Sequence, residues 1–339
     1  MEVGVATSWR GATIDRIRAI SMEADKLGYD YLWIPEAWGL EVFSTIGNLL
    51  GDTSRIKIGA GVVNVFSRSA AVIGMGCATL DQIAPGRFAL GLGSSGRALI
   101  ESWHGVKFEE AFKRTEEYVE VIKKVARGEQ VDFDGEILNL HRFRLYSKPV
   151  SGDLEIYLGA MGDKNLSIAG KICDGAILTM YPISKLDSAQ SLVAGGKKVF
   201  AYIHLAITES DEETKNARDE VARNIAFYVG SMGGYYARNL RRLGFQRSVE
   251  KIIERRASTQ RGGSVADSVD PVLIDELSLI GSASEVMERI LKFPQSVVPV
   301  FVPVPAYGQE ASSEKRTANE IASLESFARE AGLNSCKLS

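Results

Sequence analysis

The stretch GRFALGLGSSG, residues 86–96, contains the pattern G-x-G-x-x-G at Gly91, Gly93 and Gly96. Either the phosphate-binding turn of a dinucleotide-binding domain or the glycine-rich end of a barrel strand can produce this pattern. The dinucleotide turn belongs to the first strand–helix connection of its domain, whereas three such units precede this one. It also needs an acidic residue at the end of a strand about 20 residues later, and that distance falls in the helical pattern of residues 108–117. We therefore interpret the glycines as a strand end that lets the backbone approach a flat ligand.

Short apolar runs alternate with amphipathic helical patterns on both sides of this stretch, which is typical of βα units and a parallel sheet. The expected strands are residues 2–7, 29–34, 56–63, 87–93, 155–160, 174–179, 198–208 and 296–305. Residues 131–147 predict a hairpin that turns at Asp134-Gly135, and residues 209–292 predict a mostly helical insertion before the last strand. Eight strand–helix units predict an α/β fold, the (β/α)8 TIM barrel. No Pro/Gly/Ser-rich linker divides the chain before residue 209, so we expect residues 1–339 to form a single domain.

The composition argues against several classes of protein. The 339 residues include 40 Lys and Arg against 43 Asp and Glu, so the formal net charge of −3 gives no basic surface for nucleic acid. The three cysteines have no C-x-x-C spacing, which argues against a zinc site or a disulfide framework. No run approaches the ~20 apolar residues of a membrane span, and no basic leader precedes the first expected strand. We expect a cytoplasmic protein without a metal site that binds neither nucleic acid nor membrane.

Four segments together resemble a known family, the bacterial luciferase-like (β/α)8 oxidoreductases, and in particular its branch that uses coenzyme F420, a deazaflavin. The segments are DYLWIPEAWG (30–39) and residues 56–96, 101–124 and 157–179. The loop GVVNVFSR (61–68) is similar to the third-strand loop of the methylenetetrahydromethanopterin reductases. The resemblance implies coenzyme F420 as cofactor, a small-molecule substrate, and a homodimer or larger homo-oligomer.

The resemblance also implies where the ring system of the cofactor binds. In the family the third strand ends in a non-prolyl cis peptide that bulges against the middle ring, and the matching bond is Gly61–Val62. Asn64 would meet the pyrimidine edge, although its side chain could equally satisfy the backbone of its own loop. Backbone and hydroxyl groups of Gly93, Ser94 and Ser95 would border the rings.

The family binds the cofactor phosphate through backbone N–H groups after the fifth strand. The matching residues are Gly159, Ala160, Met161 and Gly162, which lead into a helix at about Asp163. A helix N-terminus attracts anions because its first N–H groups are free and its dipole is positive there. The alternative is an ordinary helix start without a ligand, and we expect Asp163 to act as its cap.

Glu36 follows the second expected strand, where an acidic residue at the barrel rim could polarise a substrate or transfer a proton. It could also be a carboxylate at a helix N-terminus without a catalytic task. The family often carries a histidine next, where this chain has Ala37, so that general acid is absent. Trp9 and Trp38 are expected as aromatic walls of a substrate pocket, with core packing as the alternative. His204, within the seventh expected strand, is expected to be packed.

Two other functions remain open from the sequence. An FMN-dependent monooxygenase of the same superfamily would use reduced FMN and oxygen. A barrel that binds a flavin without turnover is the third possibility, because the histidine and the carboxylates of the methylenetetrahydromethanopterin reductases are missing. Ala6 stands where those enzymes have a carboxylate at the first strand end, which argues against a pterin substrate.

Overall fold

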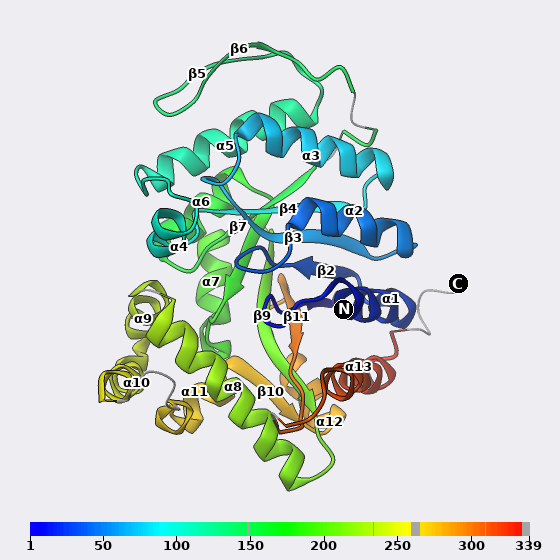
Figure 1. Cartoon of the computed structure of the whole chain (residues 1–339), viewed down its shortest axis with the longest axis vertical. Coiled ribbons are helices and arrows are strands. Elements are labelled where there is room, and N and C mark those ends of the chain that lie inside the picture. The colour runs from blue at the N-terminus through cyan, green and yellow to red at the C-terminus, as the bar shows by residue number, and fades with distance from the viewer. Residues whose placement is uncertain (148–149, 153, 233, 259–264, 309, 334–339) are drawn as a thin grey trace.

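Eight parallel strands form a closed barrel, which confirms the predicted (β/α)8 fold (Figure 1). The computed structural model describes residues 1–147, 150–152, 154–232, 234–258, 265–308 and 310–333. The barrel strands in chain order are β1 (Gly4–Ala6), β2 (Tyr31–Ile34), β3 (Lys57–Asn64), β4 (Phe88–Gly93), β7 (Glu155–Gly159), β8 (Gly175–Thr179), β9 (Lys198–Ile207) and β11 (Val297–Pro303). Each strand pairs with the next, and β11 closes the ring by pairing with β1.

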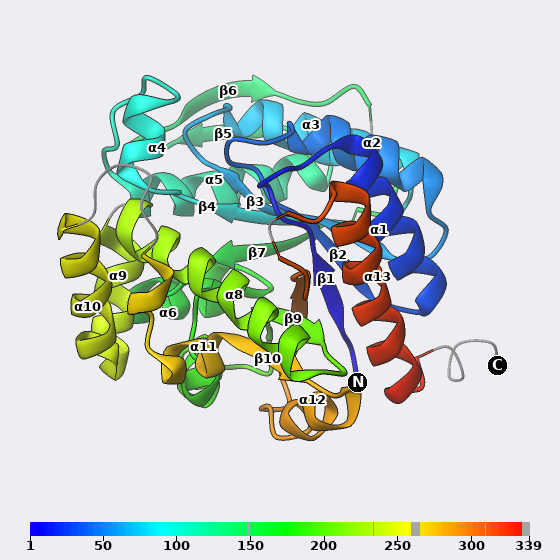
Figure 2. The ribbon, with the colours of Figure 1, turned by 60° about the horizontal axis from the view of Figure 1, so that its bottom comes forward.

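Amphipathic helices surround the barrel and bury their apolar faces against it (Figures 1 and 2). They are α1 (Ile14–Leu27), α2 (Val42–Asp52), α3 (Ala70–Ile83), α4 (Arg97–Ser102), α5 (Ala111–Ala126), α6 (Asp163–Ile172), α7 (Leu186–Val193) and α13 (Ser313–Glu330). Local signals set the helix ends: Thr13 caps α1 through its hydroxyl, and Gly28 ends it with a φ of 95°. In the described residues, no helix combines the length and the apolar character that crossing a bilayer requires.

The predicted hairpin between α5 and β7 is confirmed. It consists of β5 (Val131–Asp134) and β6 (Asn139–Phe143), which pair antiparallel apart from the barrel. The buried carboxylate of Glu117 on α5 accepts hydrogen bonds from the backbone N–H groups of residues 136–138 at 2.8–3.0 Å. One carboxylate thus fixes the turn of the hairpin to the helix beneath it.

Residues 209–292 are mostly helical, but they also contain a strand that the sequence did not predict. The helices are α8 (Asp211–Ser231), α9 (Gly234–Leu240), α10 (Gln246–Ser258), α11 (Pro271–Leu277) and α12 (Ala283–Ile290), with a π-helical segment, η2 (Arg241–Phe245). The unpredicted strand, β10 (Ser278–Gly281), pairs with residues 204–207 of β9. Its neighbour β8 pairs only with residues 198–202 of β9, so β10 covers an edge that β8 leaves open.

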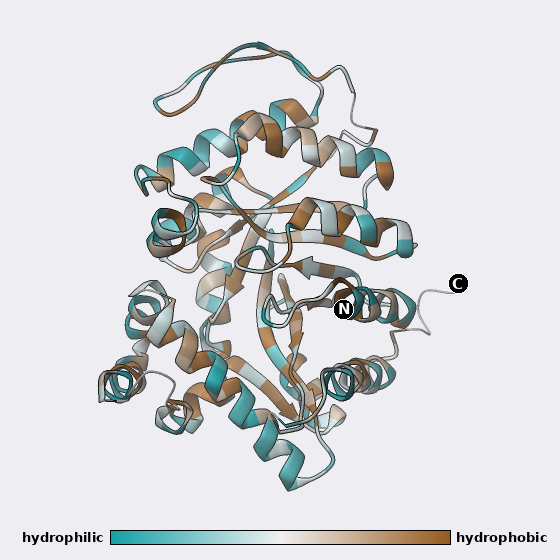
Figure 3. Cartoon of the chain, viewed as in Figure 1, coloured by the Kyte–Doolittle hydropathy of each residue, from teal (hydrophilic) through white to brown (hydrophobic). Residues whose placement is uncertain are grey.

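Aromatic side chains fill the barrel interior below the carboxyl ends of the strands. Trp33, Tyr157 and Phe200 pack edge to face with centroids 4.8–5.8 Å apart, and Tyr31 joins them. Gly59 leaves room for this cluster, because a Cβ atom there would collide with the Trp33 ring. In Figure 3 the central strands are largely hydrophobic, while the outer helices carry hydrophilic faces. Among the described residues, this cluster fills the barrel beneath the carboxyl ends of the strands.

Candidate active site

A cavity of about 490 Å³ opens at the carboxyl ends of the barrel strands, where enzymes of this fold carry their active sites. Its wall includes residues at or just beyond the ends of all eight barrel strands, together with residues of α4, α8 and α9. The cavity contains every site residue that the sequence predicted except Gly162: Trp9, Glu36, Trp38, Gly61, Val62, Asn64, Gly93, Ser94, Ser95, Gly159, Ala160 and Met161. Gly162 lies directly beyond this set as the residue before α6.

Glycines from two strands, β4 and β7, face the Val62 side chain of β3. The β3–β4 register gains one residue between Ala60 and Val63, and the Gly61–Val62 bond is cis, as the family resemblance implied. Added Cβ atoms on Gly91, Gly93 and Gly159 would approach the Val62 side chain to 3.1–3.2 Å. The glycine pattern in residues 86–96 therefore admits a neighbouring strand's side chain, and the barrel interpretation of that stretch is confirmed.

Asn64, which is expected near the rings, has protein partners of its own. The Asn64 Oδ1 atom accepts a hydrogen bond from the Phe66 backbone N–H at 3.0 Å, and its Nδ2 lies 3.4 Å from the His104 Nε2 atom. The alternative for Asn64, a side chain that satisfies its own loop, therefore holds for the oxygen. Ser95 has a φ of 58°, which turns the chain from β4 into α4 at the cavity edge.

The turn between β7 and α6, predicted as the phosphate site, differs from the prediction in one respect. Gly162 is the N-cap residue of α6 and has no side chain to cap it, so no side-chain cap occupies the first-turn N–H groups. Asp163 is not the cap that the sequence predicted. Its carboxylate instead accepts a hydrogen bond from the Arg242 guanidinium at 2.5 Å, and Arg242 also donates to the Met161 carbonyl at 2.8 Å. The helical insertion thus contacts the turn between β7 and α6 through Arg242.

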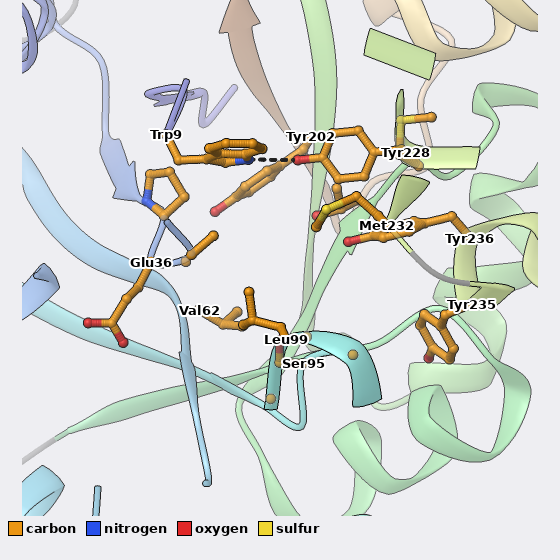
Figure 4. Close-up of a pocket in the computed structure, with 18 of the residues that line it drawn as sticks. Trp9, Glu36, Val62, Ser95, Leu99, Tyr202, Tyr228, Met232, Tyr235 and Tyr236 are labelled. Atoms are coloured by element: carbon orange, nitrogen blue, oxygen red, sulfur yellow. Dashed lines mark hydrogen bonds between the residues drawn. The ribbon is translucent and has the colours of Figure 1, made fainter. Parts of the chain in front are cut away.

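Glu36 lines the cavity, but other groups hold its carboxylate. Arg68 pairs with both carboxylate oxygens at 2.6 and 2.7 Å, and the Val42 backbone N–H at the start of α2 donates to Oε1 at 3.2 Å. Hydrogen bonding to Glu36 raises the pKa of Arg68. In Figure 4 the Glu36 carboxylate points away from the aromatic side chains of the cavity. These contacts match the alternative of a helix-N-terminal carboxylate, and a catalytic role for Glu36 stays a prediction.

Aromatic side chains form the wall opposite Val62 (Figure 4). Trp9 and Trp38 lie edge to face with centroids 5.3 Å apart, and the Trp9 indole N–H donates to the Tyr228 hydroxyl at 3.3 Å. The sequence interpretation missed the partners that α8, its C-cap residue and α9 supply: Tyr228, Met232, Tyr235 and Tyr236. Counted from Tyr228, the other three follow at four, seven and eight residues, a helical spacing that was available in the sequence, although the structure divides them between two helices.

The inward face of β9 contributes Tyr202 and His204, two residues apart. Within the described residues the buried Tyr202 hydroxyl has no hydrogen-bond partner, and burial raises its pKa well above the usual value. The His204 Nδ1 atom lies 3.3 Å from the Leu277 carbonyl, and burial lowers the pKa of this ring. His204 is packed as expected, being only 7% exposed, yet it also forms part of the cavity wall.

Comparisons with known proteins agree with this geometry. A family model described as luciferase-like monooxygenase matches residues 1–298. The chain is 30% identical to the 5,10-methylenetetrahydromethanopterin reductase of Archaeoglobus fulgidus over 276 residues, which cover 79% of this chain and 82% of that protein. It is 32% identical to the F420-dependent glucose-6-phosphate dehydrogenase of Kineococcus radiotolerans over 192 residues, 53% of this chain and 56% of that one.

A solved structure gives the same result for the fold. The coenzyme F420 dependent tetrahydromethanopterin reductase from Methanopyrus kandleri superposes with a TM-score of 0.79 at 22% identity, and the match covers 97% of this chain and 99% of that chain. The resemblance found in the sequence is confirmed. The chain belongs to the luciferase-like monooxygenase family.

Proposed function

We propose that this chain is a coenzyme F420-dependent oxidoreductase that moves a hydride between the deazaflavin and a small organic molecule. The Kineococcus and Methanopyrus relatives are both named as F420-dependent, and the Archaeoglobus relative is named as a reductase. The observation that carries the proposal is the wall around Val62. Gly61, Gly93 and Gly159 line the cavity there and add no side chain of their own, so Val62 is the side chain of this wall that a planar ring would meet.

The chain's own groups fit the remaining parts of such a cofactor. The first turn of α6 would hold a phosphate through its backbone N–H groups, and residues 159–162 lead directly into it. The aromatic side chains of α8 and α9 would exclude water from the open face of the ring. When bound, the deazaflavin supplies the hydride-transfer chemistry, and the protein supplies position and a dry environment.

Tyr202 is the group that we assign to the reacting oxygen or nitrogen of the substrate. Because burial raises its pKa, the hydroxyl stays protonated at neutral pH and acts as a hydrogen-bond donor. The described protein groups leave that hydroxyl without a partner, although a buried polar group of this kind normally has one. We assign a hydride transfer related to that of the Archaeoglobus reductase, on a substrate other than a pterin, because Ala6 offers no carboxylate at the end of β1.

An FMN-dependent monooxygenase is the second candidate, because the matching family model bears the monooxygenase description. The test is a titration of purified protein into coenzyme F420, followed by the quenching of the deazaflavin fluorescence. We expect binding at micromolar concentrations. A preference for FMN, together with oxygen consumption when a flavin reductase is added, would instead establish the second candidate. Binding of neither cofactor would remove both.

A set of three variants tests the position of the ring in the same titration. A Cβ atom on Gly61 would collide with the Tyr202 hydroxyl, so Gly61→Ala should weaken F420 binding by about tenfold, the equivalent of about 1.4 kcal/mol. Tyr202→Phe removes the colliding oxygen, so the double variant should bind better than Gly61→Ala alone. Equal F420 affinity of wild type and Gly61→Ala would contradict the proposed position.

A further inference from the structure

Arg10 carries the one charge on the cavity wall that no described group compensates. Two side chains with a full charge at neutral pH, Arg10 and Glu36, are among the residues lining the cavity. Arg68 neutralises Glu36 through its two short hydrogen bonds. The wall therefore has a net positive charge, and that charge lies just beyond the end of β1.

The Arg10 guanidinium is stacked on aromatic rings and makes no polar contact with the described protein. Its Cζ atom lies 3.7 Å from the centroid of the Phe227 ring and 5.3 Å from that of Trp9. Within the described ranges none of its side-chain N–H groups donates a hydrogen bond, and no carboxylate lies within 4.0 Å. Its hydrogen bonds are made by the backbone: the N–H donates to the Ser8 hydroxyl at 3.1 Å, and the carbonyl accepts from the Arg16 guanidinium at 3.4 Å. A guanidinium has five N–H donors, which stacking orients but does not satisfy.

The carboxylate that acts electrostatically on Arg10, that of Glu220, is already engaged. Glu220 on α8 acts on Arg10 electrostatically, but its carboxylate pairs with Arg223 at 2.8 Å and with Arg316 at 3.2 Å. Burial lowers the pKa of Arg10, yet a guanidinium remains charged at neutral pH after such a shift. Partial burial of a charge without a partner costs free energy, and a bound anion would recover it.

Topology separates Arg10 from the expected phosphate site. The barrel order runs β1-β2-β3-β4-β7 in one direction and β1-β11-β9-β8-β7 in the other, so β7 lies opposite β1. The uncapped start of α6 follows β7, whereas Arg10 follows β1 beside the aromatic wall. The two cationic features therefore serve opposite ends of whatever occupies the cavity.

We propose that Arg10 is a specificity-determining residue that binds the carboxylate of a substrate with a planar, apolar body. The fork of the guanidinium matches the two oxygens of a carboxylate, and Trp9, Trp38 and Tyr228 provide surfaces for the apolar part. One part of the inference rests on the proposed function, namely that the bound acid is the substrate that reacts. The carboxylate site itself stands on the geometry of Arg10.

The test compares benzoate with benzamide, its uncharged analogue of the same shape, by NMR titration of the protein without cofactor. We expect wild type to bind benzoate at least about tenfold more tightly, a difference that added salt reduces. Arg10→Gln should abolish the preference, and Arg10→Lys should retain part of it. The matched control is Arg97→Gln: Arg97 is also stacked on a ring, Phe108 at 5.2 Å, but it is paired with Glu101 at 2.6 Å. This control should keep the full preference.

Equal or absent binding of the two probes by wild type would overturn the proposal, as would a preference that survives in Arg10→Gln with an unchanged thermal unfolding profile. A titration with coenzyme F420 distinguishes substrate from cofactor as the source of the anion. We expect Arg10→Gln to bind F420 as wild type does, and a tenfold loss would assign Arg10 to the acidic tail of the cofactor instead. If no variant bound F420 while benzoate was still discriminated, the proposed function would fail and the carboxylate site would remain.

Discussion

Gly91 shows that a glycine in the same sequence pattern can have either of two structural roles. In a dinucleotide-binding turn a glycine lets backbone approach a pyrophosphate, whereas here an added Cβ atom would collide with the Ala60 carbonyl oxygen and approach Val62. The same reasoning applies at Gly93 and Gly159, whose close neighbour is also the Val62 side chain. The close approach is therefore between strands, and the flat wall toward the cavity is its by-product.

This explanation predicts the stability of a Gly91→Ala variant. The colliding atom is backbone, which cannot move aside as a flexible side chain can, so we expect unfolding to become easier by about 1–3 kcal/mol or more. Gly51→Ala on α2 is the matched control, because nothing lies within 4 Å of its added Cβ atom. The midpoint of urea denaturation measures both. Similar midpoints for the two variants would contradict the packing explanation.

At the scale of elements, the helical insertion and the barrel meet through Arg242. This residue of η2 binds both the Asp163 carboxylate and the Met161 carbonyl at the start of α6. Its guanidinium neutralises an acidic group that would otherwise repel a phosphate at the same helix end. The insertion thus prepares the turn electrostatically as well as covering the cavity.

Arg242→Gln should therefore weaken the binding of coenzyme F420 by about tenfold, about 1.4 kcal/mol, because the Asp163 charge is released. The same substitution should weaken the binding of the deazaflavin without its phosphate much less. Adding Asp163→Asn should restore part of the loss. The control is Arg241→Gln, since the neighbouring Arg241 pairs with Glu250 at 2.9 Å and makes no described contact with the turn. Fluorescence titration gives all the affinities, and an equal loss for both ligands would argue against the electrostatic role.

The hairpin of β5 and β6 should depend on pH through Glu117. Burial alone would raise the pKa of this carboxyl, but three backbone hydrogen bonds together with Lys113 outweigh it, so the pKa lies below its usual value. The stabilisation is therefore fully present above the unfolded pKa of about 4.3 and is lost as the pH falls through the lower folded value.

Hydrogen exchange measures this effect at the backbone N–H groups of residues 136–138, compared with the N–H groups of the barrel strands. We expect protection of the hairpin turn to fall below about pH 4 while the barrel is still folded. Glu117→Gln should lose much of that protection at neutral pH. Protection that is independent of pH in this range would show that other contacts hold the hairpin.

At the scale of the whole molecule, the outer face of α3 is the surface that we propose for self-association. Val72, Met75 and Ile83 are 51%, 48% and 51% exposed, and they repeat at helical spacing along that face. The double variant Val72→Asp/Met75→Asp should be monomeric where wild type forms a homodimer or larger assembly, as measured by light scattering after size exclusion. Leu291→Asp, a 68% exposed leucine directly after α12, is the control that should leave the assembly intact. A monomeric wild type would refute this assignment.

The elements and residues that depend on local sequence pattern were predicted. Those that depend on contacts between distant segments of the closed barrel were missed. Alternating apolar runs and helices predicted the eight barrel strands, and glycine spacing together with family resemblance predicted most of the wall around Val62. β10 was not predictable in this way. Its four residues pair with the part of β9 that extends beyond the residues paired with β8. Arg10 and Tyr202 were missed for a similar reason: their significance is the lack of a partner, which is a property of the folded surroundings. Asp163 was misassigned because Arg242 reaches it from 79 residues away.

The aromatic cluster of Trp33, Tyr157, Phe200 and Tyr31 closes the barrel beneath the cavity. A molecule that enters from the rim can therefore depart only by the route it took inward. When two ligands lie one above the other in such a dead end, the outer one must leave before the inner one can. Turnover would then follow an ordered kinetic mechanism, with a fixed order of ligand binding and release. Product-inhibition patterns measure that order.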